Sequence, residues 1–325
     1  MQGLVTVFGG SGFVGAQVVR ALAKKGLRVR VAVRNPGRGY RLRMLGDVGQ
    51  IEVVQANIRV PASITRALEG AQGCVNLVAV MHERGRQKFQ VLHAMGARNV
   101  AEAAAKAGVT RFVQVSAIGA DANSPSKYAR TKALGEAAVR ELIPSATIVR
   151  PSIVFGPEDD FFNRFASMAV SAPVLPLIGG GKTRFQPVFV GDLAAAVAAC
   201  VFDPSTAGKT YEIGGPAVFT FKALMQVICR EIGRHPLLLP IPFDAAALIG
   251  FGGDVMGALP IPIAPPLTSD QVTQLRHDNV VSADALTLAD LGIEPTALET
   301  IVPSYLYRFR KGGQYADQLA VAAKV

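Results

Sequence analysis

Three glycines near the start of the chain have the spacing of a nucleotide-binding turn. Gly9, Gly12 and Gly15 follow a short apolar run, 3–8, and precede an amphipathic run, 16–26. Between a strand and a helix, such glycines permit a tight turn, close approach of the backbone to a pyrophosphate, and close packing of helix on strand. The free N–H groups at the helix start then face the phosphates. The residues expected at the pyrophosphate are Gly9, Gly12, Phe13, Val14 and Gly15.

A basic side chain stands where the choice between the two nicotinamide cofactors is made. The second predicted strand ends at Arg34, 19 residues after Gly15, and Arg38 follows it with no acidic residue nearby. An acidic residue at this place would bind a free ribose 2′-hydroxyl, whereas arginine matches a 2′-phosphate in charge and in its forked geometry. The sequence therefore favours NADP(H) over NAD(H).

These two arginines belong to a longer basic segment. From Arg20 to Arg43 the chain holds nine basic residues and no acidic one, and its formal net charge is +10. Such an excess implies an anionic partner or cofactor. The segment is either a solvated face or part of the phosphate site, and the sequence leaves both open.

Two further strand ends complete the expected cofactor path. Asn57 and Ile58 follow the third predicted strand and are placed to hold the adenine. Ala79 and Val80 follow the fourth and would line the path towards the ribose. These positions share one edge of the sheet, because ligands of open parallel sheets bind outside the carboxyl ends of the strands.

A Tyr-x-x-x-Lys pair lies in a helical run after the fifth predicted strand. Tyr128 and Lys132 are four residues apart, so they share one face of a helix. A lysine beside a phenol lowers the phenol's pKa, and it can also hold a ribose hydroxyl. The pair is therefore expected to bind the nicotinamide ribose and is the candidate for acid–base chemistry.

The elements that must position these residues alternate along the chain. The runs expected to be strands are 3–8, 27–34, 51–58, 74–80, 111–120 and 146–156. The runs expected to be helices are 16–26, 63–71, 89–107 and 127–143. This alternation predicts an α/β protein with a Rossmann-type, doubly wound parallel sheet.

The character of the chain changes after Gly156, which indicates a smaller C-terminal lobe. The sheet domain is expected to comprise 1–156 and about 186–215. The lobe would comprise about 157–185, a loop-rich stretch, and 216–302, with a tail at 303–325.

One stretch of the expected lobe, 236–267, is apolar and rich in proline. Its only charges are Asp244 and Asp254, and its best window for a membrane span, 245–264, contains Asp254 and two prolines. A central charge and helix-breaking prolines argue against a span. The stretch is either an interface with a membrane-embedded assembly or part of the lobe's own core.

The motifs resemble those of the short-chain dehydrogenase/reductase superfamily, in its extended or atypical, epimerase/dehydratase-like form. The resemblance rests on GGSGFVG at 9–15, Ser116 in VQVSAIG, YARTK from Tyr128 to Lys132, and RPSIVFGP at 150–157. It implies that Ser116 and Pro151 also line the cofactor site. In that family a Ser or Thr completes a triad with the Tyr and Lys, and by register this position is Ala117. Alanine at this position departs from the family pattern, which argues against catalysis but does not affect the expected cofactor binding.

Two longer runs, 150–170 and 176–194, resemble a narrower family, the nucleotide-binding accessory subunits of respiratory complex I. That resemblance implies tightly held NADPH, a largely structural role, and a seat on the hydrophilic arm near the membrane. The implied partners are other subunits of that complex. The implied location is peripheral, at the cytoplasmic face of a bacterial inner membrane. The run 305–311 interleaves aromatic and basic residues, which suits contact with lipid headgroups or with an acidic partner. An active NADP-dependent reductase or sugar-nucleotide epimerase/dehydratase remains the alternative.

Other patterns exclude several classes of function. The hydrophobic fraction of 50% excludes a disordered chain, and the three cysteines Cys74, Cys200 and Cys229 form no CxxC pair. The four histidines lack metal-ligand spacing, so no metal site is expected. No nucleic-acid motif accompanies the basic charge. Residues 158–160 are acidic, and they form either a catalytic pair or a solvated turn or partner contact.

Overall fold

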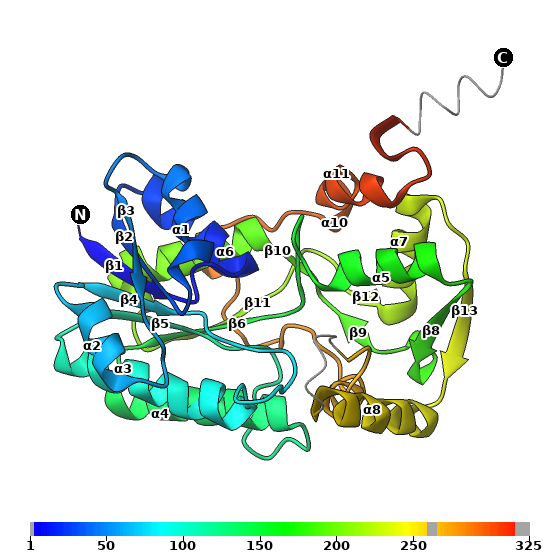
Figure 1. The fold of residues 1–325 in the computed structure, drawn as a ribbon, viewed down its shortest axis with the longest axis horizontal. Helices are drawn as coiled ribbons and strands as arrows, with labels where there is room; N and C mark the ends of the chain where they lie inside the picture. Colours follow the sequence, from blue (N-terminus) through cyan, green and yellow to red (C-terminus); the bar gives the residue numbers. More distant parts are fainter. Residues whose placement is uncertain (1–2, 259–264, 316–325) are drawn as a thin grey trace.

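The centre of the structure, a computed structural model, is one parallel sheet of seven strands (Figure 1). The structure describes residues 3–258 and 265–315. In spatial order the strands are β11 (Thr210–Ile213), β6 (Thr147–Pro151), β5 (Arg111–Val115), β4 (Gly73–Asn76), β1 (Leu4–Phe8), β2 (Arg28–Val33) and β3 (Ile51–Gln55). The order reverses at β1, so the carboxyl ends of β1 and β4 flank the crevice of a doubly wound fold. The predicted fold class is confirmed.

Helices cover both faces of this sheet (Figure 1). On one face α1 (Phe13–Lys24) packs against α6 (Val190–Phe202), and on the other α2 (Pro61–Leu68), α3 (Gly96–Lys106) and α4 (Lys127–Leu142) lie together. Each face has its own cluster of buried Val, Leu, Ile and Ala side chains. The central strands β1, β4 and β5 are buried on both sides, as a sheet covered on both faces requires.

Several element boundaries differ from those predicted. The expected strand 146–156 is interrupted at Ser152: β6 stays in the main sheet, while β7 (Val154–Phe155) pairs with β10 (Val188–Phe189) in a separate ribbon. The expected helix 89–107 begins with a π-helical segment, Gln90–Met95, that leads into α3. A π-helical insertion of this kind is frequent at functional sites.

The C-terminal lobe is built on aromatic packing. Its elements are α5 (Phe161–Ser171), β8 (Val174–Ile178), β9 (Arg184–Phe185), β12 (Phe219–Thr220), α7 (Phe221–Ile232), β13 (Leu237–Ile241), α8 (Phe243–Ala258), α9 (Ser269–Gln274), α10 (Leu298–Ile301) and α11 (Pro303–Leu306). The prediction that 157–185 is loop-rich is wrong, because α5 and β8 form there. Phe161 and Phe165 of α5 pack edge-on against Phe221, which fixes α5 in the lobe's core.

The predicted tail begins inside this lobe. Tyr305 and Leu306 are buried, and the Tyr305 hydroxyl donates to Asp159 Oδ2 at 2.7 Å. The expectation that 305–311 meets lipid is therefore wrong for these two residues. The rest of the predicted tail, 316–325, lies outside the described residues.

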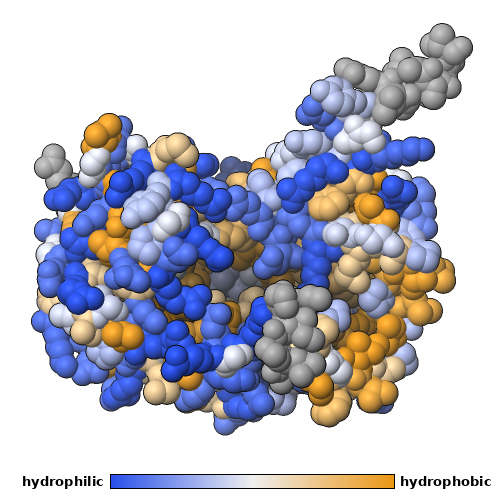
Figure 2. All heavy atoms as spheres, viewed as in Figure 1, coloured by the Kyte–Doolittle hydropathy of each residue, from blue (hydrophilic) through white to orange (hydrophobic). Residues whose placement is uncertain are grey.

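The apolar stretch 236–267 is partly exposed. Figure 2 shows hydrophobic side chains gathered over the C-terminal lobe, and the exposed members on β13 and α8 are Leu237, Leu239, Leu248, Ile249, Phe251 and Val255. Residues 259–264 of the stretch lie outside the described residues. Within the described ranges, no helix has the length and apolar character needed to cross a bilayer.

Candidate cofactor site

The glycine turn has the geometry of a phosphate cradle. Gly9 adopts φ +82°, which favours glycine, and Gly12 donates from its N–H to the Gly9 carbonyl at 3.1 Å before α1 begins. A Cβ on Gly15 would lie 2.6 Å from Gly10 Cα and would also collide with the Gly9 carbonyl oxygen. The turn therefore places α1 as close to β1 as backbone allows, with its first N–H groups directed at the crevice.

The arginine pair lies beside this turn, at the carboxyl end of β2. Arg34 and Arg38 are both exposed, and neither guanidinium forms an ion pair with any residue that the structure describes. Arg38 closes a short 3₁₀ turn that starts at Asn35. Two unpaired guanidinium groups at the strand end suit a ribose phosphate.

The two residues expected at the adenine, Asn57 and Ile58, differ in their burial and in their hydrogen bonds. The side chain of Ile58 is buried in the core against Gly96 of α3, and its carbonyl accepts from Asn99 Nδ2 at 2.9 Å. Asn57 is half-buried, and its Oδ1 accepts from the Arg59 backbone N–H at 3.1 Å. The Ile58 side chain is therefore part of the core, whereas Asn57 is half-buried after the end of β3.

Ala79 and Val80 lie in the loop after β4. Ala79 is exposed, and the Val80 N–H donates to His93 Nε2 at 3.1 Å. This bond ties the loop to the π-helical segment before α3.

Lys132 is a buried cation with spare donors. Its Nζ donates to the Val115 carbonyl at the end of β5, at 3.0 Å, and its side chain reaches no other hydrogen-bond acceptor in the described ranges. Burial lowers the pKa of Lys132 to about 8, although the nearby Glu136 carboxylate opposes this shift. An ammonium has three N–H donors, so the remaining two fit the hydroxyls of a ribose.

Tyr128 lies on the same face of α4, but its electrostatics differ from those expected. Its ring meets the rings of Phe89 and His93 edge-on, at centroid distances of 5.7 and 5.2 Å. Burial, with a smaller effect from the Asp270 carboxylate, raises the pKa of Tyr128 to about 12. The expectation that Lys132 lowers this pKa is wrong, because burial dominates.

His93 is a site residue that the sequence analysis missed. Its Nε2 accepts the Val80 N–H, so Nδ1 carries the proton towards Thr131 Oγ1, 3.2 Å away. Burial and the Lys132 charge lower the pKa of His93 to about 3, so the ring is neutral. The available signal was its position four residues after Phe89 on a helix, since the two rings stack at 5.2 Å.

Ser116 supplies an unsatisfied hydroxyl at the end of β5. Its Oγ is buried and has no hydrogen-bond partner among the described residues. A buried hydroxyl normally finds a partner, and a bound cofactor would supply one. Ala117, the expected triad position, is half-buried and has only a methyl group, while the Pro151 carbonyl accepts from the Ile118 N–H at 3.0 Å.

The C-terminal lobe adds Asn279 to this edge of the sheet. Its Oδ1 accepts from Ser152 Oγ at 2.7 Å and from the Ile153 N–H at 3.1 Å. No local pattern signals this contact, because its partners lie more than a hundred residues earlier in the chain.

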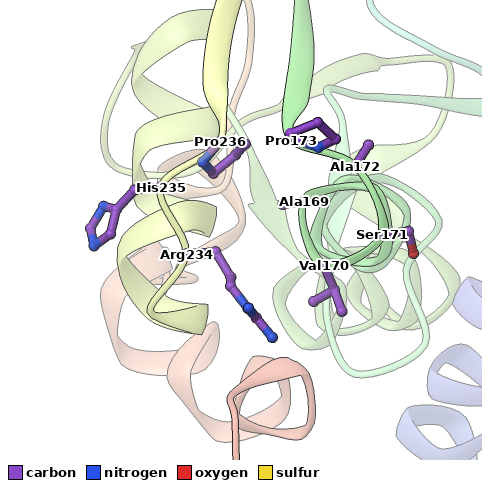
Figure 3. Close-up of a pocket in the computed structure, with 8 residues that line it drawn as sticks. All are labelled: Ala169, Val170, Ser171, Ala172, Pro173, Arg234, His235 and Pro236. Atoms are coloured by element: carbon purple, nitrogen blue, oxygen red, sulfur yellow. The ribbon is translucent and has the colours of Figure 1, made fainter.

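The other candidate groups have structural roles or lie elsewhere. Asp159 is buried and accepts from the Phe162 N–H at 2.5 Å at the start of α5, while the exposed Glu158 carboxylate lies 3.7 Å from the Arg41 guanidinium. No group of three potential metal ligands occurs in the described part of the chain. A surface pocket of about 410 Å³ lies at the end of α5, where Figure 3 shows Arg234 directed inward and His235 directed away. It is remote from the carboxyl edge of the sheet.

Comparisons with known proteins agree with this geometry. The NAD dependent epimerase/dehydratase family matches residues 5–214. NADH dehydrogenase (ubiquinone) 1 alpha subcomplex subunit 9, mitochondrial, of Arabidopsis thaliana is 37% identical over 96% of this chain and 80% of its own length. The mitochondrial NADH-ubiquinone oxidoreductase 40 kDa subunit of Neurospora crassa is 32% identical over 95% and 80%. Ceramide reductase of Caulobacter vibrioides is 33% identical over 74% of each chain.

A solved structure shares the fold. The NADPH-dependent quinone oxidoreductase of Escherichia coli superposes with a TM-score of 0.73 at 22% identity, over 93% of this chain and 99% of that one. The expected location at a bacterial inner membrane is contradicted, because the plant and fungal relatives are mitochondrial proteins. With its family motifs in place on the doubly wound sheet, this chain belongs to the NAD dependent epimerase/dehydratase family.

Proposed function

We propose that this chain is an NADPH-holding accessory subunit of the respiratory NADH:ubiquinone oxidoreductase, complex I, and turns over no substrate of its own. Two relatives above 30% identity are named as components of that oxidoreductase and align over almost the whole chain. The exposed apolar side chains of β13 and α8 support contact with other subunits. We place the chain on the hydrophilic arm, near the membrane.

Two features of the site support the non-catalytic role. Burial raises the pKa of the Tyr128 phenol to about 12, whereas a general acid or base works best when its pKa lies near the working pH. The observation that carries the role is that Ala117, the expected triad position, offers no hydroxyl to a substrate oxygen. A donor of that kind is commonly worth about 10²–10³ in rate.

The cofactor half of the proposal rests on groups that lack partners. Arg34 suits a 2′-phosphate, Lys132 has spare donors for a ribose, and Ser116 Oγ is buried without an acceptor or donor in the described ranges. Bound NADPH would supply a hydride donor. The residues of this chain would hold and orient it.

The test is isolation of the tagged chain from its own cells in mild detergent, followed by a native gel. The proposal predicts that the chain comigrates with NADH:quinone oxidoreductase activity. Recovery of the chain only as a free protein, with none in the oxidoreductase band, would contradict the subunit role.

A second candidate function is an NADPH-dependent reductase. The ceramide reductase relative and the Tyr128–Lys132 pair favour it. Steady-state NADPH oxidation with long-chain keto substrates or sugar nucleotides separates the two functions. Multiple turnovers that disappear in Tyr128→Phe would establish the reductase, and persistence of bound NADPH would support the accessory subunit.

A further inference from the structure

A carboxylate of the C-terminal lobe sits on the helix that carries Tyr128 and Lys132. Asp270, at the second position of α9, accepts the Lys127 N–H on Oδ1 at 2.6 Å. Its Oδ2 accepts the Tyr128 N–H at 3.2 Å and the Ser126 hydroxyl at 2.9 Å. The contact joins residues more than 140 positions apart.

This placement is electrostatically favourable. The first N–H groups of a helix have no partner within it, and the positive end of the helix dipole attracts an anion. Ser126 already caps α4 by accepting from the Ala129 N–H, so Asp270 satisfies the donors that remain. The result is a first turn of α4 whose position is set by the other lobe.

Asp270 itself is held rigidly. Gln274 Nε2 donates to its Oδ2 at 3.0 Å, and α9 begins with a reciprocal capping box between Thr268 and Gln271. On the outer side, α9 packs on α8, where Asp254 Oδ2 accepts from the Ser269 N–H at 3.4 Å. A carboxylate on so fixed a support determines where the start of α4 lies.

We infer that Asp270 is a positioning residue for the nicotinamide half of the cofactor site. Tyr128 is bonded through its own N–H to Asp270, and Lys132 follows one turn later with its Nζ at the end of β5. The adenine half is built from the glycine turn and Arg34, which Asp270 does not touch. The inference rests on the proposed binding of NADPH.

Attachment of the two lobes does not depend on this contact alone. Asn279 bonds to Ser152 and Ile153, and Ser282 donates from its N–H to Glu212 Oε2 at 2.9 Å. A change at Asp270 is therefore expected to move the start of α4 without separating the lobes.

The test compares two ligands on Asp270→Asn. The amide keeps the size of the side chain but removes its charge and turns one acceptor into a donor facing the helix N–H groups. We expect NADPH, followed by its fluorescence, to bind about tenfold more weakly, the equivalent of one such cap. Adenosine 2′,5′-bisphosphate, which occupies only the adenine half, should bind as in the wild type.

Asp284→Asn is the matched control. Asp284 is an exposed residue of the same lobe that forms no hydrogen bond or ion pair with the described residues, so this variant makes the same change in charge and both ligands should bind to it unchanged. Gln274→Ala removes one support of Asp270 and leaves the α4 cap in place, and it should weaken NADPH binding by a smaller factor. This milder variant gives the same comparison if Asp270→Asn does not fold.

The outcomes separate this inference from the proposed function. Equal NADPH affinity in wild type, Asp270→Asn and Gln274→Ala would overturn the positioning role and leave NADPH binding intact. Equal weakening of both ligands would also overturn it, because it would show a general loss of structure. Failure of the wild type to bind either ligand would overturn the proposed cofactor, and the positioning role with it.

Discussion

Replacement of Arg34 by aspartate should remove the preference for NADPH over NADH. Arg34 stands directly after β2, exposed, and its guanidinium has no ion pair with the described residues. The aspartate would repel a 2′-phosphate and could accept from a free 2′-hydroxyl, as an acidic residue at this strand end does.

The magnitude follows from the exposure of the site. A hydrogen bond to a charged group is worth about 1.5–3 kcal/mol, and solvent around Arg34 places it near the lower end of that range. Because about 1.4 kcal/mol is tenfold in affinity, the dissociation constant for NADPH should rise about 10–30-fold. The constant for NADH should change by less than about threefold on the same scale.

The assay is a titration of ligand-free protein with each dinucleotide, followed by NADPH or NADH fluorescence. Arg28→Asp is the control, because Arg28 is exposed and lies on the same strand but at its opposite end, about 20 Å away. It makes the same change in net charge. The selectivity of this control should stay close to that of the wild type.

Two results would refute this reasoning. If Arg34→Asp and Arg28→Asp weaken NADPH binding equally, net charge rather than a specific contact attracts the ligand. If the wild type prefers NADH, the strand-end arginine does not select the cofactor.

Three further variants test the site and its support. Lys132→Met should stabilise the ligand-free protein at pH 7 by about 1–3 kcal/mol, because the folded state holds a buried cation whose pKa is lowered to about 8. The Val115 carbonyl would still accept a hydrogen bond from the Gln114 amide after this substitution. This gain in the free energy of unfolding should shrink as the pH rises from about 8 towards the ordinary pKa of lysine, above which the side chain is neutral in both the folded and the unfolded state. Urea denaturation at pH 7 and at pH 9.5 measures the gain. A gain that grows with pH would contradict the assignment of a lowered pKa to Lys132. Gly15→Ala should destabilise the protein by about 1–3 kcal/mol and abolish NADPH binding, because the new Cβ would lie 2.6 Å from Gly10 Cα. Thermal unfolding and NADPH fluorescence measure the two effects, and undiminished binding would show that the turn does not hold the phosphates closely. Tyr305→Phe should lower the free energy of unfolding, measured with urea, by about 1–2 kcal/mol, because it removes the hydroxyl that donates to the buried Asp159 carboxylate. The affinity for NADPH should stay unchanged. A loss of affinity would show that the core of the lobe controls the cofactor site.

The sheet could be predicted from sequence because its signals are local. Each strand is a short run that is either apolar or alternating, and Gly9, Gly12 and Gly15 mark the turn between the first strand and helix. The helix α5 was missed although its buried residues Phe162, Ala166 and Ala169 recur at helical spacing, so a local signal was present.

The candidate site could be predicted only where one segment supplies it. Tyr128 and Lys132 were found by their spacing, but the pKa of Tyr128 depends on burial against Phe89 and His93 and on a carboxylate from the other lobe. Ile58 was assigned to adenine by its place after a strand, whereas the close approach of α3 at Gly96 turns it into the core. Such contacts depend on tertiary packing, which spacing does not encode.

The central claim is that this chain holds NADPH as part of complex I. The most direct measurement is the nucleotide content of NADH:ubiquinone oxidoreductase isolated from cells that carry either the wild-type chain or Arg34→Asp. The account predicts NADPH in an amount equal to that of the wild-type chain in the isolated oxidoreductase, and a smaller amount per chain with Arg34→Asp. An oxidoreductase that contains the wild-type chain without NADPH, or that lacks the chain altogether, would contradict it.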